Sequence, residues 1–148
     1  MVMGIKQLQR LFRRDAGLEI DKSDVKRLSD FISNRLRALL LQGQVTASVN
    51  GRDIIDYQDI PITAGLQQAI HDFRAFDEEL AIGPILAQQQ TLPPLKMEFS
   101  VLLEVKLPEL VGGITLGLIR VFRTLNPDMK NPTAKEWEQV EAIYRILL

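Results

Sequence analysis

Residues 21–60 read DKSDVKRLSDFISNRLRALLLQGQVTASVNGRDIIDYQDI and determine the architecture that the chain can adopt. Their apolar side chains recur every three or four residues, the spacing of one face of an α-helix. These positions are Val25, Leu28, Phe31, Ile32, Leu36, Leu39 and Leu40. Asp21 with Asp24 predicts a capping box at the start, and Asn50-Gly51 predicts the end. We therefore expect one helix of about 28 residues, roughly 42 Å long.

Shorter helices are predicted on both sides of this long one. Residues 5–15 place Ile5, Leu8, Leu11 and Phe12 on one face, and Gly17 follows where a left-handed cap is expected. The opposite face carries four cations, which we call the basic arc: Lys6, Arg10, Arg13 and Arg14. Residues 59–73 predict a third helix with Pro61 in its first turn. The order is thus short helix, loop, long helix, loop, short helix.

The second half of the chain predicts the same order of elements. A short helix is expected near residues 76–90, then a Pro93-Pro94 connector and a long helix over 96–125 that Pro108 should kink or divide. A loop over 126–132 and a last helix follow, with Thr133 and Glu136 as its capping pair. We expect a single domain, residues 1–148, made of two halves of about 5–74 and 76–148 joined through residues 73–77.

The segment Gly51-Arg52-Asp53-Ile54-Ile55-Asp56-Tyr57-Gln58-Asp59-Ile60 resembles the Gly-Arg-Lys-Thr-Ile-x-x-x-Asp-Ile segment of archaeal-type histones. Asp15-Ala16-Gly17 also stands where those proteins carry Asn-Ala-Gly. The chain resembles the prokaryotic family of single-chain double-histone-fold proteins, whose function is not established. This resemblance implies an all-α fold with two histone-fold copies in one chain, forming an intramolecular handshake pseudo-dimer and hence a monomer. It also implies that Arg52 and Asp59 form a structural pair.

The same resemblance argues against strong DNA binding. Asp53, Ile54 and Glu19-Ile20 occupy positions where histones place basic or hydroxyl residues against phosphate. A carboxylate there repels phosphate, and lost phosphate contacts remove most of a sequence-independent affinity. The basic arc remains the candidate contact for an acidic protein or for nucleic acid, although an ordinary exposed helix face explains it equally well. Nucleic-acid binding is expected to be weak and nonspecific at most.

Composition and motifs exclude several other classes of function. The 148 residues include 46% hydrophobic and 25% charged residues, as in an ordered soluble protein, and no cysteine. His71 is the only histidine, so a metal site or a Ser-His-acid triad is not expected. Gly112, Gly113 and Gly117 lack the lysine of a phosphate-binding loop and are better explained by close helix packing. No catalytic residue, metal ligand or cofactor is predicted.

Charge and hydropathy complete the functional hypothesis. The net charge is −1, but residues 1–50 carry nine Lys and Arg against five Asp and Glu, which leaves the remainder acidic. No apolar run is long enough for a membrane span, so we expect a soluble cytoplasmic protein. The sequence predicts a non-enzymatic protein-interaction or scaffolding module with an unknown protein partner. The alternative is a weak, nonspecific DNA-binding architectural protein.

Overall fold

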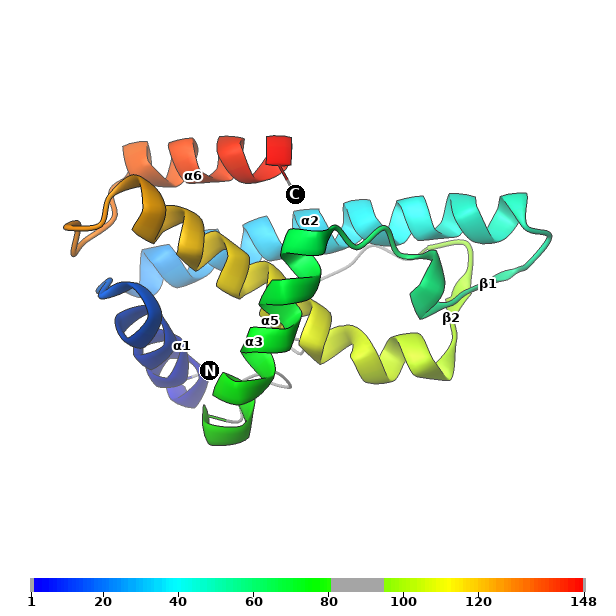
Figure 1. Cartoon of the computed structure of the whole chain (residues 1–148), viewed down its shortest axis with the longest axis horizontal. Coiled ribbons are helices and arrows are strands. Elements are labelled where there is room, and N and C mark those ends of the chain that lie inside the picture. The colour runs from blue at the N-terminus through cyan, green and yellow to red at the C-terminus, as the bar shows by residue number, and fades with distance from the viewer. Residues whose placement is uncertain (1, 81–94, 148) are drawn as a thin grey trace.

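The computed structural model describes residues 2–80 and 95–147, and helices dominate both ranges (Figure 1). In chain order the elements are α1 (Val2–Ala16), α2 (Lys22–Val49), β1 (Ile54–Ile55), the 3₁₀ helix η1 (Tyr57–Asp59), α3 (Ala64–Leu80), β2 (Glu98–Phe99), α5 (Val101–Leu125) and α6 (Ala134–Leu147). The prediction of a mostly helical protein is therefore confirmed. None of the helices in these ranges has the length and apolarity needed to cross a membrane.

The bounds of α2 agree with the sequence prediction because local side chains fix both ends. Asp21 accepts a hydrogen bond from the Asp24 N–H at 3.0 Å, and Asp24 accepts one from the Asp21 N–H at 2.9 Å. This capping box satisfies two N–H groups that a helix start leaves free. At the other end, Gly51 has a φ of 74°, which glycine adopts without strain. The resulting helix has the 28 residues predicted.

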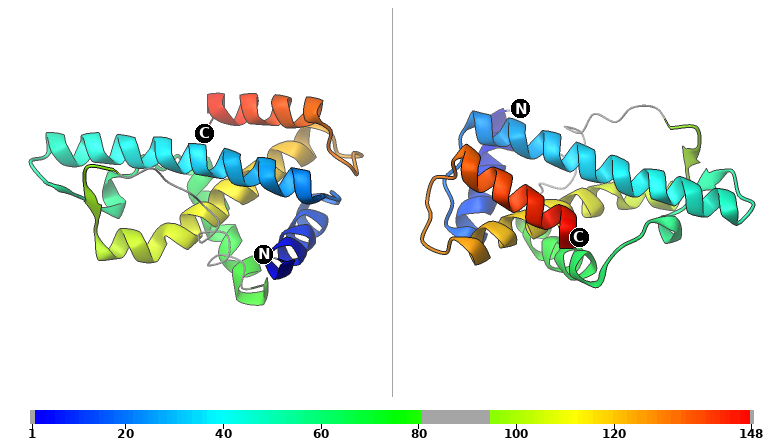
Figure 2. Two further views of the ribbon diagram at one scale, coloured as in Figure 1. Left: turned by 180° about the vertical axis from the view of Figure 1, so that it is seen from behind. Right: turned by 90° about the horizontal axis from the view of Figure 1, so that it is seen from above.

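Two long helices, α2 and α5, cross and contact each other, and the shorter helices pack around them (Figures 1 and 2). Buried leucine and isoleucine side chains of α2 meet the apolar middle of α5, where residues 110–119 are all buried. The helix α6 adds Trp137, whose ring packs edge-on against Phe122 at 4.8 Å. The Trp137 Nε1–H also donates to Asp24 Oδ1 at 2.8 Å, which joins the last helix to the cap of α2.

Loops that are distant in sequence meet at both ends of the molecule. At one end β1 and β2 pair in parallel, with Ile54 opposite Glu98 and Ile55 opposite Phe99. At the other end the Glu19 N–H donates to the Lys130 carbonyl at 2.6 Å, between the loop after α1 and the loop before α6. Figure 1 shows these two pairs of segments at opposite ends of the crossed helices. At each end of the molecule, a segment from the first half of the chain thus contacts a segment from the second half.

The most extensive helix contact joins α3 and α5. A Cβ added at Gly112 would lie 2.2 Å from two atoms of the Phe73 ring, and one added at Gly113 would lie 2.4 Å from Ile70 Cγ1. The two backbones approach this closely only because these positions have no side chain. These contacts support the helix-packing explanation of Gly112 and Gly113.

Two predicted features of the first half are wrong. The third helix begins at Ala64 instead of Asp59, because the Thr63 hydroxyl accepts the Leu66 N–H at 3.2 Å and so starts the helix later. Pro61 consequently lies in the connector before α3 and not in its first turn. In addition, α3 continues to Leu80, so the junction expected at residues 73–77 lies inside a helix.

The second long helix begins later than predicted and is not divided. It starts at Val101, after β2, with Ser100 as its N-cap accepting the Leu103 N–H at 3.0 Å. Pro108 lies inside α5, and the helix changes direction between its start and its end (Figures 1 and 2). The helix predicted over 76–90 falls largely, and the Pro93-Pro94 connector entirely, outside the described residues.

Candidate functional site

The basic arc does not act as one free surface. Lys6 and Arg10 are exposed, but Arg13 forms a bidentate pair with Glu19, with Nε–Oε1 at 2.9 Å and Nη2–Oε2 at 3.1 Å. This hydrogen bonding lowers the pKa of the Glu19 carboxyl. The Arg14 guanidinium lies over the ring of Phe76 on α3, 5.8 Å from its centre. Two of the four cations therefore have intramolecular partners, and Lys6 and Arg10 form the outward part of the arc.

Arg52 and Asp59 lie together in the connector between α2 and α3. The guanidinium donates two hydrogen bonds to the carboxylate, Nη1–Oδ2 at 2.7 Å and Nη2–Oδ1 at 2.6 Å. The Asp59 side chain is only 2% exposed and also accepts the Asp56 N–H at 2.9 Å. Hydrogen bonds from Arg52 lower the pKa of Asp59. Both terminal nitrogens of the arginine are engaged by this carboxylate, so the pair braces the turn between α2 and α3.

The other residues considered from the sequence are dispersed. His71 is exposed on α3, and no group of three or more His, Asp or Glu side chains within residues 2–80 and 95–147 could hold a metal ion. Its neighbour Asp72 instead accepts a hydrogen bond from Arg120 Nη1 at 2.7 Å, an ion pair that joins α3 to α5. This hydrogen bond lowers the pKa of Asp72. The contact between Arg120 and Asp72 thus holds α3 against α5.

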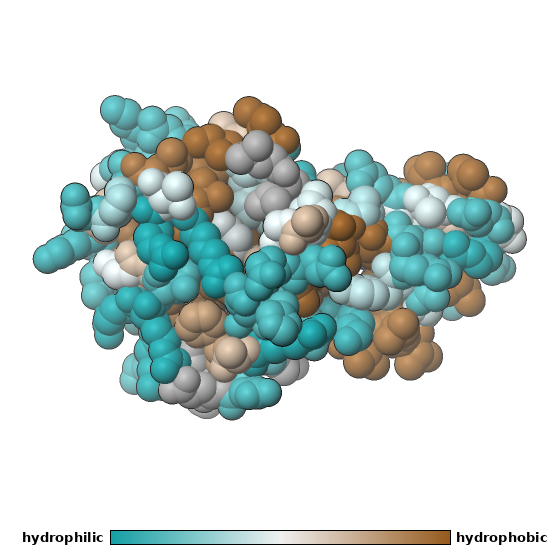
Figure 3. All heavy atoms as spheres, in the orientation of Figure 1, coloured by the Kyte–Doolittle hydropathy of each residue, from teal (hydrophilic) through white to brown (hydrophobic). Residues whose placement is uncertain are grey.

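An apolar surface at one end of the molecule was not anticipated from the sequence. Val101, Leu102 and Val105 form what we call the α5 stripe, and their residues are 78%, 50% and 66% exposed. Val45 and Val49 near the end of α2 are also exposed. Figure 3 shows apolar surface over the end of α2 and the start of α5. Apolar side chains that gather on a surface often mark a contact with another protein.

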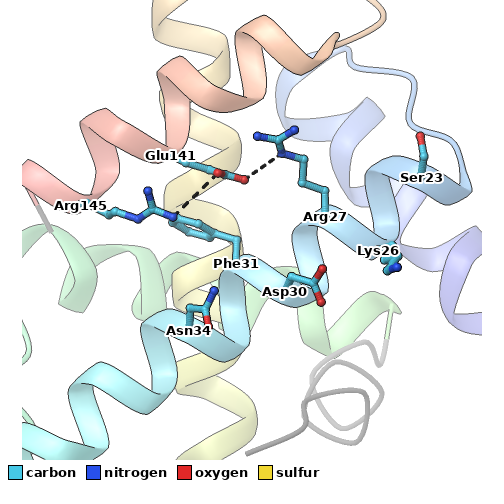
Figure 4. Close-up of a pocket in the computed structure, with 8 residues that line it drawn as sticks. All are labelled: Ser23, Lys26, Arg27, Asp30, Phe31, Asn34, Glu141 and Arg145. Carbon is cyan, nitrogen blue, oxygen red and sulfur yellow. Dashed lines mark hydrogen bonds and ion pairs between the residues drawn. The ribbon is translucent and has the colours of Figure 1, made fainter.

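A groove runs between α2 and α6, and we call it the α2–α6 groove (Figure 4). Its volume is about 410 Å³, within the range of small-molecule sites. Residues from one face of α2 form most of its lining: Ser23, Lys26, Arg27, Asp30, Phe31 and Asn34. The helix α6 contributes Glu141 and Arg145.

The two arginines of the α2–α6 groove converge on Glu141, whose side chain is 12% exposed. Arg27 Nε donates to Glu141 Oε1 at 3.1 Å, and Arg145 Nη2 lies 3.9 Å from Glu141 Oε2. Arg145 also lies over the ring of Phe31, 5.9 Å from its centre. Figure 4 shows both guanidinium groups directed toward this carboxylate. The arrangement positions two arginines from different helices beside one open space.

The fold and these surfaces define a mostly helical protein built on two crossed long helices. The chain belongs to the family described as "Domain of unknown function (DUF1931)", which it matches over residues 8–145. An uncharacterized protein of Aquifex aeolicus (strain VF5) is 32% identical over 143 residues, covering 88% of this chain and 83% of the relative. A second uncharacterized protein of that strain is 23% identical over 140 residues, covering 95% and 81%.

Solved structures share the same fold over nearly the whole chain. A crystal structure of a protein from Thermus thermophilus has a TM-score of 0.84 and 38% identity, and the match covers 100% of both chains. A crystal structure of a protein from Aquifex aeolicus has a TM-score of 0.80 and 21% identity, covering 98% of this chain and 95% of the other. The second likeness concerns the fold alone.

Proposed function

We propose that this protein is a non-enzymatic protein-interaction or scaffolding module, built as two histone-type halves that form an intramolecular handshake. The order short helix, long helix, short helix in residues 2–80 supports the first half. A long helix followed by a short one, α5 and α6, supports the second. The proposal assigns no catalytic role to any residue.

The paired loops are the strongest support for the handshake. The loop before α3 meets the loop before α5 through β1 and β2, and the loop after α1 meets the loop before α6 through Glu19 and Lys130. Two halves related by an approximate twofold axis would make these two contacts as equivalents of each other. The covalent connection makes the association intramolecular, so it would not depend on protein concentration.

The α5 stripe is the single observation that carries the interaction function. Its three apolar residues are at least half exposed, although α5 is otherwise the most deeply buried helix of the described residues. Exposing apolar surface to water is unfavourable in free energy, and a partner that covers the surface would relieve this. We therefore place the protein contact on this stripe.

The test compares the wild-type chain with two surface variants of the full chain. It measures which proteins each of them retains from native cytosol of the organism that encodes this chain. Val101→Gln with Val105→Gln changes the stripe, and Lys6→Gln with Arg10→Gln changes the basic arc. Proteins held by the wild type and the arc variant should be lost from the stripe variant. Identical retention by all three proteins would refute the assignment to the stripe.

Weak DNA binding is the second proposal, and one observation favours it. Lys6 and Arg10 are exposed, and neither forms an ion pair within the described residues. Cations on an exposed helix can contact phosphates without reading bases. A nuclease-sensitive retention that is lost only in the arc variant would favour this alternative over the protein contact.

A further inference from the structure

The α2–α6 groove shares no lining residue with the α5 stripe or the basic arc, and neither proposed function uses it. Three cations line it, Lys26, Arg27 and Arg145, against two carboxylates, Asp30 and Glu141. One of these carboxylates, Glu141, is shared by both arginines. The cations are therefore not fully neutralised within the groove.

The arginines keep most of their hydrogen-bonding capacity. Within residues 2–80 and 95–147, Arg27 bonds to Glu141 through Nε, which leaves its two terminal nitrogens for other acceptors. Arg145 is 3.9 Å from the same carboxylate, longer than a hydrogen bond, so its guanidinium can bind another oxyanion without losing one. Its side chain is also supported from one side by the ring of Phe31. Glu141 thus orients both guanidiniums while occupying few of their donors.

Guanidinium pairs of this kind suit a phosphate group. Each guanidinium presents several N–H donors in one plane, which matches the oxygens of phosphate, and an ammonium such as that of Lys26 adds a point charge. The remaining lining of Ser23, Asp30 and Asn34 offers hydroxyl, carboxylate and amide groups for a polar ligand body. The volume of about 410 Å³ fits a small molecule.

We propose that the α2–α6 groove is a binding site for a small phosphate-bearing molecule, with its phosphate held by Arg27, Arg145 and Lys26. The site joins the N-terminal part of α2 to α6, so an occupant would contact both helices. This assignment is independent of the protein contact proposed for the α5 stripe.

The probe is pyrophosphate, titrated into the ¹⁵N-labelled full chain at low ionic strength and followed by NMR, including the arginine Nε–H signals. Saturable shifts should appear at Arg27, Arg145 and their neighbours, and sodium chloride at the same ionic strength should not reproduce them. Arg145→Gln and Lys26→Gln should each weaken binding, with about a tenfold loss for Arg145→Gln because a charged hydrogen-bond donor is removed.

Lys135→Gln is the matched control, since it removes one charge from an exposed position near the start of α6 and outside the groove. It should change the affinity by no more than about twofold, as expected for an exposed charge. Equal losses in all three variants would mean general charge screening and would overturn the proposal. The absence of saturable binding at millimolar pyrophosphate would overturn it as well.

Two competing ligands complete the test. Citrate at the same ionic strength should bind more weakly than pyrophosphate, and equal binding would refute the choice of phosphate. A short DNA duplex should not displace pyrophosphate from these signals. If the duplex displaced pyrophosphate when its concentration, counted in phosphate groups, was lower than that of pyrophosphate, the groove would be assigned to nucleic acid. That result would refute the small-molecule proposal.

Discussion

Replacing Gly113 by alanine should destabilise the protein, although alanine is the better helix former. An added Cβ would lie 2.4 Å from Ile70 Cγ1, 3.1 Å from the Ile70 backbone nitrogen and 3.2 Å from its Cα. Rotation of the side chain can relieve the first contact but not the other two, which belong to the backbone of α3. The two helices would have to separate by a few tenths of an ångström.

The expected magnitude is a balance of two effects. Alanine gains about 1 kcal/mol over glycine inside a helix, whereas overpacking a well-filled core costs about 1–3 kcal/mol and occasionally more. Because α3 and α5 form the most extensive helix contact, we expect the steric cost to exceed the gain at Gly113. The net loss of unfolding free energy should be positive and reach up to about 2 kcal/mol, with a melting temperature lower by about 2–4 °C per kcal/mol.

Urea denaturation followed by circular dichroism measures this loss, and Gly112→Ala provides an internal comparison. The three atoms nearest to a Cβ at Gly112 would all belong to the Phe73 ring, so Phe73→Leu should partly compensate Gly112→Ala in a double-mutant cycle. Ile70→Val should compensate Gly113→Ala less, because the backbone contacts remain. Unchanged or increased stability of both alanine variants would refute the close packing of α3 on α5.

The remaining predictions concern the core, the ends of the chain and the surface. Leu39→Ala should cost about 2–5 kcal/mol in chemical denaturation, because Leu39 is buried. Asp59→Ala should cost about 1–3 kcal/mol through lost hydrogen bonds. Since the folded pKa of Asp59 is lowered, that stabilisation is complete above the unfolded value near 4 and is lost as the pH falls through the folded value, so the cost should shrink in acid. Tyr144→Phe should leave stability unchanged or raise it, because the buried hydroxyl has no hydrogen-bond partner among residues 2–80 and 95–147; a loss above about 1 kcal/mol would contradict this. The fragment 1–75 should be aggregated, dimeric or poorly folded in light scattering, because it exposes the face of α3 that packs on α5; a stable monomer with the melting behaviour of the whole would refute the shared core. Duplex DNA in a band-shift titration should bind weakly, and two contacts from Lys6 and Arg10 would lose about 12-fold in affinity from about 50 to 200 mM salt; sub-micromolar binding at the higher salt in a variant with all four arc residues changed to alanine would contradict it.

The parts of the fold that could be predicted depend on short-range interactions. Asp21 and Asp24 cap α2 through side chains three residues apart, and Gly51 ends it through its own backbone conformation. Where two local signals compete, the sequence alone did not decide between them. Pro61 suits a first helical turn, but Thr63 provides a hydroxyl cap two residues later, and the helix starts there.

The candidate surfaces depended on contacts between distant segments, which the sequence does not reveal. Val101 and Val105 share a helix face, yet their exposure depends on which neighbours cover α5. The pair Arg13 and Glu19 depends on a shorter-range contact, because its two residues are six positions apart with the turn at Gly17 between them. The α2–α6 groove joins residues more than 110 positions apart, as the bond from Arg27 to Glu141 illustrates. Helical periodicity places each of these side chains on a face of its helix, but it does not show which helix faces pack against each other.

The hydrogen bond between Trp137 and Asp24 gives the molecule a built-in optical reporter. Trp137 is the only tryptophan of the chain, so all indole fluorescence comes from one buried site. That site touches the last helix, the start of α2 and the Phe122 ring of α5 at once. Separation of α6 from α2 would bring water to the indole and shift its emission to longer wavelength. Emission and far-ultraviolet ellipticity should therefore change together if the protein unfolds as one unit, whereas a change in emission before the loss of ellipticity would mean that α6 separates from α2 first.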